Sequence, residues 1–438
     1  MKKRFSLRAL LSLCVAVAMC IALAIPGFAV DATSSATKTE SSNSLFAGGS
    51  GTKADPYEIS TVGQLLAINT DLGGNYELVN DIDFSGIDAW LPIGYYSIDI
   101  EAMLSGSEEV PAALAFHGTF DGNGYTLKNL EIVSANIMAG AVFGFTGGDA
   151  YLHDVNLENI STTSGLCAGS LVGWASGNTV IENVKANNVK ARAITMVGGL
   201  CGSSNGNVTV KNATVTNGSA TAGVSLLDGA LELAESYGQA GGIIGGGDCT
   251  SFENCKVKNF RVTDKIARND GFGGLSGCAN EAKYIKNCSV ENVTIKAKAG
   301  AVASIGGLTG FTGTEAGIKK AAKRTVVSGC TVKNVKIVVS DEAERVGGLI
   351  GGGTYRSDEQ SQPFAFLIQN CKVENVTIKT HGKYVGAVLG YQPKNSAVKS
   401  TTVKNVTLNG KAFTKKVGAS IKAVPYTELT TFGMSMSL

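Results

Sequence analysis

The sequence predicts an all-β fold, a parallel β-helix in which successive coils of one chain stack along a single axis. Three observations support this prediction. A unit of about thirty residues recurs through most of the 438-residue chain. Each unit alternates apolar and polar residues, which is the pattern of a half-buried strand. Each unit also carries the motif Gly-Gly-Leu-x-Gly or a close variant of it.

The glycine motif sets the period of the repeat. Its first glycine recurs at intervals of 29 to 43 residues, so a basic unit accepts insertions. The positions taken as equivalent are Gly140, Gly169, Gly198, Gly241, Gly273, Gly306, Gly347, Gly386 and Gly418. The motif is typical of a turn beside a close-packed strand. It does not resemble a phosphate loop, because no helix follows it and no Lys-Ser/Thr pair closes it.

The segment from Ile285 to Lys296 shows the alternation most clearly. Its apolar positions are Ile285, Cys288, Val290, Val293 and Ile295, and its polar positions are Lys286, Ser289, Glu291, Thr294 and Lys296. One unit cannot bury its apolar face alone, whereas a second unit stacked ~4.8 Å away gives every strand a parallel partner and forms a continuous core. Nine coils of this kind would rise roughly 40 Å.

One asparagine recurs between the two apolar pairs of each unit. The equivalent residues are Asn159, Asn188, Asn217, Asn259, Asn292, Asn334, Asn375 and Asn405. Asparagine tolerates a left-handed backbone, and its amide can bond the same amide one coil away. We therefore expect a stacked row of amides at a bend. The alternative is a row of ligands for a sugar or a cation.

The N-terminus predicts export. Residues 1–29 contain a basic start, an uncharged apolar run and small residues at Gly27 and Ala29, as in a signal peptide cleaved near Ala29. An uncleaved membrane anchor is the alternative. Cleavage lowers Lys+Arg from 38 to 34 against 36 Asp+Glu, a net charge of about −2, which gives no reason to expect a polyanionic partner. We predict a secreted or cell-surface protein that does not bind nucleic acid and that has no membrane span after cleavage.

The segments before the repeats differ from them. Residues 30–47 are rich in Ser, Thr, Ala and Lys and predict a disordered leader. Residues 48–135 predict an N-terminal cap with the first coils: a short amphipathic helix begins at Ser60 or Thr61, residues 76–84 alternate as one strand, and residues 116–132 form a strand, a tight turn and a strand. Residues 136–425 contain the repeats, and residues 426–438 form a tail.

The motifs of the cap and the repeats together resemble a known family. The motifs are Gly-Ser-Gly-Thr from Gly49, Asp-Pro-Tyr-x-Ile from Asp55, Trp-x-Pro-Ile-Gly from Trp90 and Phe-x-Gly-Thr-Phe-Asp-Gly-Asn-Gly-Tyr from Phe116, followed by the repeated Gly-Gly-Leu-x-Gly. This order resembles the GLUG-motif family of bacterial exported and surface proteins. The resemblance implies a right-handed parallel β-helix with a capped N-terminus, in adhesins or in non-catalytic parts of larger enzymes. It implies no catalytic residue.

Eight cysteines remain after the signal peptide. Cys255, Cys288, Cys330 and Cys371 occupy one repeat position, where other units have Val155, Val184, Ala213 and Thr401. A position shared with valine and alanine is a small apolar one, so we expect four free thiols in the core. Cys167, Cys201, Cys249 and Cys278 lie in or near the glycine half of the repeat, where disulfide pairing stays open.

No arrangement of residues predicts catalysis or metal binding. Glycoside hydrolysis needs two carboxylates that face one bond. The glutamates of the repeat are scattered at outward positions where neighbouring units have lysine or serine, and they are Glu182, Glu253, Glu291 and Glu374. The sequence Asp121-Gly-Asn-Gly favours an Asx turn over a calcium loop. The three histidines are scattered and no Cys-x-x-Cys occurs, so neither a metal nor a cofactor is predicted.

Two insertions are the candidate binding region. Residues 311–325 and 352–366 both follow a glycine motif, so they should leave consecutive coils at the same corner. They carry the candidate binding residues Lys319, Lys320, Lys323, Arg324, Tyr355 and Arg356. A solvated charged face is the alternative interpretation. A third insertion, from Gly218 to Gln239, contains a short amphipathic segment and belongs to another corner.

Three functional classes fit this chain. The favoured one is an exported, non-enzymatic scaffold, adhesin-like, whose loops bind a host surface, a glycan or a cell-envelope partner. A carbohydrate-active enzyme of the β-helix kind, a lyase or a hydrolase, is the first alternative. A structural spacer is the second. A groove with close carboxylates would favour the enzyme, and a patch of loops at one corner would favour binding.

Overall fold

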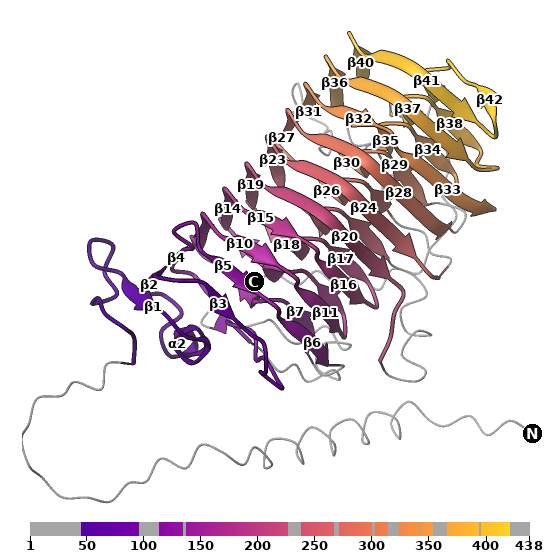
Figure 1. Cartoon of the computed structure of the whole chain (residues 1–438). Helices are drawn as coiled ribbons and strands as arrows, with labels where there is room; N and C mark the ends of the chain where they lie inside the picture. The colour runs from indigo at the N-terminus through magenta and orange to yellow at the C-terminus, as the bar shows by residue number, and fades with distance from the viewer. Residues whose placement is uncertain are drawn as a thin grey trace, which may run out of the picture.

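The computed structural model is a right-handed parallel β-helix, as the sequence predicts (Figure 1). The structure describes residues 45–95, 114–134, 137–226, 238–266, 271–299, 303–313, 324–341, 343–353, 366–393 and 396–420. The signal peptide, most of the leader and the C-terminal tail predicted from the sequence lie outside these residues. The coils stack from the N-terminal cap to β41 along one axis (Figure 1).

Four sheets run along the described part of the helix, and each coil from β4 (Thr119–Asp121) to β39 (Leu389–Gln392) contributes to all four, whereas the last described coil has no strand in the third. Sheet I contains β1 (Tyr57–Ile59), β2 (Asn75–Leu78), β4 (Thr119–Asp121), β9 (Tyr151–His153), β14 (Val180–Glu182), β19 (Thr209–Lys211), β23 (Ser251–Glu253), β27 (Tyr284–Lys286), β31 (Thr325–Ser328), β36 (Phe366–Gln369) and β40 (Ala397–Lys399). Sheet II contains β3 (Ile82–Asp83), β5 (Thr126–Lys128), β6 (Glu131–Ser134), β10 (Asn156–Glu158), β11 (Ser161–Ser164), β15 (Lys185–Asn187), β16 (Lys190–Ala193), β20 (Thr214–Ala222), β24 (Lys256–Asp264), β28 (Ser289–Ala299), β32 (Thr331–Lys333), β33 (Lys336–Asp341), β37 (Lys372–Lys379), β41 (Thr402–Leu408) and β42 (Lys411–Ala412).

Sheets III and IV are joined by the glycine motif. Sheet III contains β7 (Ala139–Gly140), β12 (Cys167–Ala168), β17 (Met196–Gly198), β21 (Gln239–Gly241), β25 (Gly271–Gly273), β29 (Ser304–Gly306), β34 (Arg345–Gly347) and β38 (Tyr384–Gly386). Sheet IV contains β8 (Phe143–Thr146), β13 (Val172–Gly177), β18 (Cys201–Gly206), β22 (Ile244–Gly247), β26 (Ser276–Asn280), β30 (Thr309–Gly313), β35 (Ile350–Gly352), β39 (Leu389–Gln392) and β43 (Val417–Ser420).

The glycines of the motif are required for close approach of backbones. A Cβ on Gly306 would overlap the carbonyl oxygen of Thr309, and a Cβ on Gly307 would overlap that of Gly348 in the next coil. Only glycine fits where two strands of one coil and the adjacent coil meet so closely. The chain therefore turns from sheet III to sheet IV within two residues.

The glycine register differs from the sequence prediction at both ends. Gly198, Gly241, Gly306, Gly347 and Gly386 are equivalent, as expected. At the N-terminal end, Gly140 pairs with Ala168, one position away from Gly169. At the C-terminal end, Val417 pairs with Leu389 and Ala419 with Tyr391, so Gly418 corresponds to Gly390, the last glycine of the preceding motif. Counting glycines alone cannot distinguish the first glycine of a motif from the last.

Apolar residues from the four sheets form one continuous core. In sheet I the inward column contains Tyr76, Phe120, Leu152, Ile181, Val210, Phe252, Ile285, Val327 and Ile368. These side chains are fully buried, or nearly so. Partly buried residues alternate with them along most of these strands, as the period of two predicts.

The N-terminal cap closes one end of this core. Helix α2 (Val62–Ala67) begins after Thr61, whose hydroxyl accepts a hydrogen bond from the backbone N–H of Gln64, as the sequence predicts. Phe46 is buried and stacks on Tyr57 with ring centroids 4.4 Å apart. Phe46 lies in the segment expected to be a disordered leader, so ordered structure begins earlier than the composition of that segment indicates.

Two strand predictions in the cap are corrected by the structure. Residues 76–84 form two strands, β2 in sheet I and β3 in sheet II, with a corner between them. Residues 116–132 contain β4, β5 and β6, which do not pair with one another; each pairs in parallel with the next coil instead. A tight turn between two short strands indicates a hairpin in most proteins, but here it is a corner of the coil.

The third insertion is also shorter than predicted. Residues 218–222 belong to β20 and pair in register with β24, from Gly218 with Phe260 to Ala222 with Asp264. The amphipathic segment expected between residues 226 and 234 lies almost wholly outside the described residues.

An asparagine ladder runs along the corner within sheet II, as predicted. The ladder asparagines have a left-handed backbone, with φ between 52° and 57°. Each amide nitrogen donates to an amide oxygen one coil towards the N-terminus, over 2.7 to 3.0 Å. Asn217 differs, because it donates to Asn187 and not to Asn188.

The ladder divides towards its N-terminal end, and each branch ends on a carboxylate. Asn217 and the residues after it continue through Asn187, which donates to both oxygens of Glu158 at 3.0 and 2.9 Å. Asn188 donates to Asn159, Asn159 to Asn129, and Asn129 to Asp83 Oδ1 at 3.0 Å. Hydrogen bonds from Asn129 and Ser85 lower the pKa of Asp83 to about 2. A second ladder, not predicted from the sequence, runs from Asn287 through Asn254, Asn212 and Asn183 to Asp154.

The last strand of sheet II differs from all others. β42 pairs with β41 in the antiparallel direction, Thr407 with Ala412 and Leu408 with Lys411. Asn409 and Gly410 between them have φ values of 49° and 82°, which suit a tight two-residue hairpin turn. The strand order of sheet II therefore ends on a two-residue strand that begins with a lysine.

We predict that Asn292→Ala lowers the free energy of unfolding by about 1–3 kcal/mol, because alanine is strained at φ 55° and the variant loses hydrogen bonds to Asn259 and Asn334. Asn292→Gly keeps the backbone conformation and should cost less. Urea denaturation measures both, with Thr294→Ala on the same strand as a control. Equal costs for the alanine and glycine variants would show that the backbone conformation is not what selects asparagine.

Candidate functional site

The two insertions predicted to bind a partner leave the β-helix at the same corner, between sheets IV and I. The first joins β30 to β31, and the second joins β35 to β36. Phe311 pairs with Gly352, and Thr325 pairs with Phe366. The ends of both insertions therefore lie side by side.

Only one of the six candidate binding residues is among the described residues. Arg324 directly precedes β31 and is exposed. Lys319, Lys320, Lys323, Tyr355 and Arg356 lie outside the described residues, so their arrangement at this corner stays a prediction.

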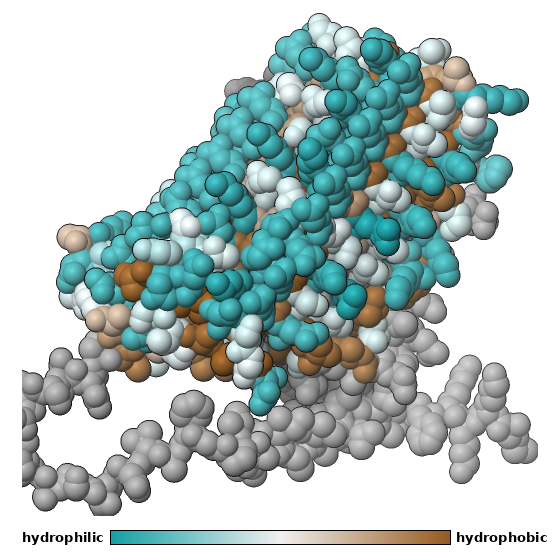
Figure 2. All heavy atoms as spheres, viewed as in Figure 1, coloured by the Kyte–Doolittle hydropathy of each residue, from teal (hydrophilic) through white to brown (hydrophobic). Residues whose placement is uncertain are grey.

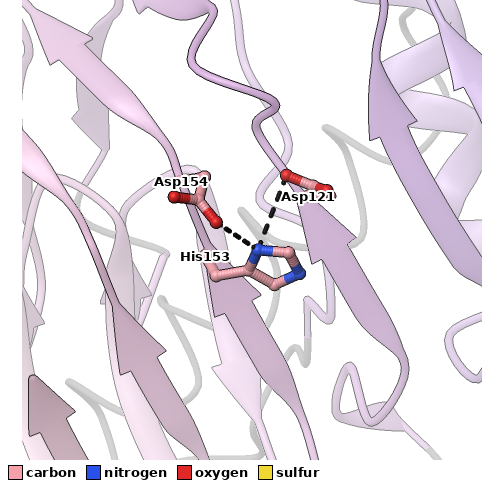
Figure 3. Close-up of side chains that lie close together, drawn as sticks. All are labelled: Asp121, His153 and Asp154. Atoms are coloured by element: carbon pink, nitrogen blue, oxygen red, sulfur yellow. Dashed lines mark hydrogen bonds and ion pairs between the residues drawn. The ribbon is translucent and has the colours of Figure 1, made fainter.

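The structure brings together Asp121, His153 and Asp154, a cluster that was not predicted from the sequence (Figure 3). Asp121 and His153 are in register on β4 and β9, and Asp154 follows His153 with a left-handed backbone. The Nδ1 atom of His153 lies 2.7 Å from Asp154 Oδ2 and 3.5 Å from Asp121 Oδ1. The register of two successive strands would have revealed this cluster, whereas distance along the chain hides it.

The surroundings of this cluster satisfy its carboxylates with protein donors. Asp121 Oδ1 accepts from the backbone N–H of Asn123 at 2.7 Å, which is the Asx turn expected from the sequence. Asp154 Oδ1 accepts from Asn183 at 3.1 Å as the end of the second ladder. The imidazole stacks on Tyr151 at 4.2 Å between centroids. The three side chains have ligand types that a cation accepts, but each is already part of a hydrogen-bond network.

A column of acids extends from this cluster into the cap. Glu58 pairs with Glu77, Glu77 with Asp121, and Asp121 with His153. Burial, followed by the nearby carboxylates of Asp121 and Glu58, raises the pKa of Glu77. Like charges opposite one another on parallel strands are destabilising. His153 ends this series of acids.

The scattered glutamates face lysines, as the repeat pattern indicated. Along sheet I, Glu182 pairs with Lys211, Lys211 with Glu253, and Glu253 with Lys286. In sheet II, Glu291 lies 3.7 Å from Lys258, and both side chains are partly exposed. These carboxylates are arranged for charge alternation along the sheet and not as a pair facing one bond.

The outer side of sheet II, which faces the viewer in Figure 1, has a strong excess of positive charge. We call the outer positions of its strands from β15 to β41 the basic face. Its lysines and arginines are Lys185, Lys190, Arg192, Lys256, Lys258, Arg261, Lys296, Lys298, Lys333, Lys336, Lys372, Lys379 and Lys404, and all are exposed. Among the described side chains, only two acids share these positions, Glu291 and Glu374. Figure 2 shows hydrophilic side chains in rows along the axis over this region.

Sequence composition conceals the basic face. The predicted mature chain is close to neutral, so its net charge gave no reason to expect a polyanion. The basic face becomes visible only when the strands of successive coils are aligned. Lysine and arginine then recur at outward positions of the strands that follow the cysteine position, whereas acids are more frequent in the cap and in sheet I.

The four cysteines of the repeat form one buried column. The backbone carbonyls of three of them accept hydrogen bonds from N–H groups of the next coil. The donors are Ser289 to Cys255, Thr331 to Cys288 and Lys372 to Cys330. The thiols donate to backbone carbonyls, for example Cys288 Sγ to Lys286 at 3.2 Å. Burial raises the pKa of Cys288 well above its usual value.

The other four cysteines are free as well. Cys167, Cys201 and Cys278 are buried, and burial raises the pKa of Cys167 to about 12. Cys249 is partly exposed, and its thiol lies 3.4 Å from Glu281 Oε2. Burial and then the Glu281 carboxylate raise the pKa of Cys249 to about 11.

Comparisons with known proteins give partial matches. No family model matches the chain. A segment of 120 residues is 30% identical to Halomucin of Haloquadratum walsbyi, covering 26% of this chain and 1% of that protein. A segment of 125 residues is 30% identical to a "Putative Gly-rich membrane protein" of Evansella cellulosilytica, covering 27% of this chain and 13% of that protein. The chain thus spans only a small part of either relative.

Solved structures with a similar path include a "putative immunoglobulin A1 protease" from Bacteroides ovatus, with 19% identity and a TM-score of 0.45 over 72% of this chain and 84% of that one. An IgA1 protease structure has 15% identity and a TM-score of 0.43, over 86% of this chain and 23% of that one. These likenesses concern the fold. In the described part of the chain, no helix has the length and apolar character needed to cross a membrane.

We predict that the cysteine column does not react with iodoacetamide in the folded protein, because thiolates are the reactive species and burial suppresses them. In denaturant without reductant, all eight cysteines of residues 30–438 should be alkylated. Peptide mass spectrometry measures both states. A disulfide between any two of Cys255, Cys288, Cys330 and Cys371 would contradict the structure.

We predict that Glu77→Gln stabilises the folded chain at neutral pH by about 0.2–1 kcal/mol, because it removes a like charge between Glu58 and Asp121. The folded pKa of Glu77 is raised, so its ionisation costs stability above that pKa and costs nothing below the unfolded pKa. The gain should therefore disappear as the pH falls through this range. Denaturation midpoints at several pH values measure it, with the exposed Glu131→Gln as the control; an equal gain there would exclude a specific role for the column.

Proposed function

We propose that this chain is an exported, non-enzymatic β-helix scaffold, a member of the GLUG-motif group, that attaches to a surface glycan or a cell-envelope partner. The observation that supports the proposal is the arrangement of two insertions at the corner between sheets IV and I. Two insertions leave consecutive coils there, and their ends are paired by adjacent strands. Loops held by a rigid scaffold are common positions for binding residues.

One further observation supports export, and a second shows how the scaffold is held together. The N-terminal sequence has the features of a signal peptide. The cysteines of the described chain are free, so the fold depends on stacking and hydrogen bonds and not on disulfides. A solenoid of this kind presents long surfaces to a partner.

A matched pair of variants tests the proposal. In the first variant, Lys319, Lys320, Lys323, Arg324 and Arg356 are replaced by serine. Exposed charges contribute little to stability, so its unfolding should change by less than ~1 kcal/mol. In the control, five exposed lysines away from this corner are replaced by serine, namely Lys53, Lys265, Lys399, Lys411 and Lys415.

A glycan array and a cell-binding assay with residues 30–438 first identify a surface that the parent binds. We expect the corner variant to bind that surface at least ~10-fold more weakly at physiological salt, since several charges near one contact act together. The control should bind as the parent does. If the folded corner variant binds equally well, the corner is a solvated edge and the role of structural spacer becomes the better description.

A further inference from the structure

The basic face has a regular spacing along the helix axis. One row of outer positions reads Lys190, Ser219, Arg261, Thr294, Lys336 and Thr377, each in register with the next coil. We call it the Arg261 row. Cations alternate with hydroxyl groups, so successive cations are two coils apart, ~9.6 Å along the axis.

The cations of the Arg261 row are available to a ligand. In the described part of the chain, no ion pair joins Lys190, Arg261 or Lys336 to an acidic side chain. The adjacent row differs, because Lys258, Glu291, Lys333, Glu374 and Lys404 alternate in sign and neutralise one another. Positive charge without an acidic partner in register is therefore concentrated in the Arg261 row, parallel to the axis and to this row of alternating charges.

We propose that the basic face binds a linear polysaccharide that carries carboxylate groups and lies along the helix axis. This inference rests on the proposed surface-binding function and adds a second contact region to the corner. The ~9.6 Å spacing of the cations is close to the length of two sugar units in an extended chain. Serine and threonine hydroxyls between the cations can donate to and accept from sugar hydroxyls.

The composition of the face favours a polysaccharide over a nucleic acid. Single-stranded nucleic acids are bound by aromatic side chains on which bases stack, and the outer positions from β15 to β41 hold lysine, arginine, threonine, serine, asparagine and glutamate with valine at position 338. The described outer side of sheet II presents no helix or narrow ribbon that could enter a DNA groove.

The shape of the face also favours a chain over a membrane. Among the described residues, no exposed large apolar one that could enter a bilayer lies between its cations. Of the exposed ones described on the chain, Leu45, Ile87, Leu91, Leu114 and Leu226 lie outside sheet II, and Val133 lies on β6, two coils before Arg192 in the same outer row. Charge in rows parallel to the axis matches a linear polymer.

The test uses residues 30–438 and three purified probes: hyaluronate, which has one carboxylate for every two sugars, polygalacturonate, which has one on each sugar, and neutral dextran. We expect the parent to bind both acidic polymers and not dextran, with an affinity that falls as salt rises. Duplex DNA and vesicles containing phosphatidylglycerol are measured beside them.

The decisive variant combines Lys190→Ser, Arg261→Ser and Lys336→Thr, which introduces residue types already present in the same row. It should bind the acidic polysaccharides at least ~10-fold more weakly and with a shallower salt dependence, because three neutralising contacts are lost. The control, Lys53→Ser with Lys399→Ser and Lys415→Ser, removes the same charge from surfaces away from both the basic face and the corner. A charge-preserving variant, with Lys190→Arg, Arg261→Lys and Lys336→Arg, should retain binding and shows that the row folds normally.

Several outcomes would overturn the inference. They are no binding of either acidic polysaccharide, an equal loss in the control variant, and tighter binding of DNA or vesicles than of the polysaccharides at physiological salt. Failure of the proposed function is a separate result. If the row variant loses polysaccharide binding while the corner variant and the parent adhere equally to cells, the inference holds and the corner proposal fails.

Discussion

In-register parallel stacking is the constraint on which the rest of this molecule depends. It places equivalent residues of successive coils ~4.8 Å apart, so every position must tolerate a copy of itself or a suitable partner. Valine, isoleucine and cysteine satisfy this requirement inside, where they pack against their equivalents. Asparagine satisfies it at the corners, because an amide both donates and accepts. Charged residues do not satisfy it, because identical charges in register repel one another. Their distribution shows how the chain limits this repulsion.

Charges on this β-helix are arranged in three ways. On sheet I they alternate in sign, from Glu182 through Lys211 and Glu253 to Lys286. On the Arg261 row they are separated by hydroxyl residues. In the cap they repeat, as Glu58, Glu77 and Asp121, and there the pKa of Glu77 is raised. The first arrangement stabilises the sheet, while the other two keep charge of one sign available at the surface.

Most of the fold could be predicted from the sequence, because a residue type that recurs at one position of each unit indicates that the units stack in register. Asn292 and Cys288 each recur at one position, and a recurring residue in a solenoid is a neighbour of its own copies. The ends of the repeat were harder to predict: Gly140 and Gly418 match the motif by residue type but not by register. The Asp121, His153 and Asp154 cluster and the basic face escaped prediction for a related reason, since both depend on which residues stack and not on which residues follow one another.

The direction of the asparagine ladders has an electrical consequence. The ladder amides donate towards the N-terminus, and from Asn217 to Asn375 each also accepts from the next coil, so the amide dipoles of this ladder point the same way and polarise one another. Such a row resembles the aligned peptide dipoles of an α-helix, with its positive end at the cap. Asp83, Glu158 and Asp154 each place a carboxylate at such an end. Three negative charges thus stabilise the polarity of the ladders, and lengthening the helix by further coils would strengthen the field that they neutralise.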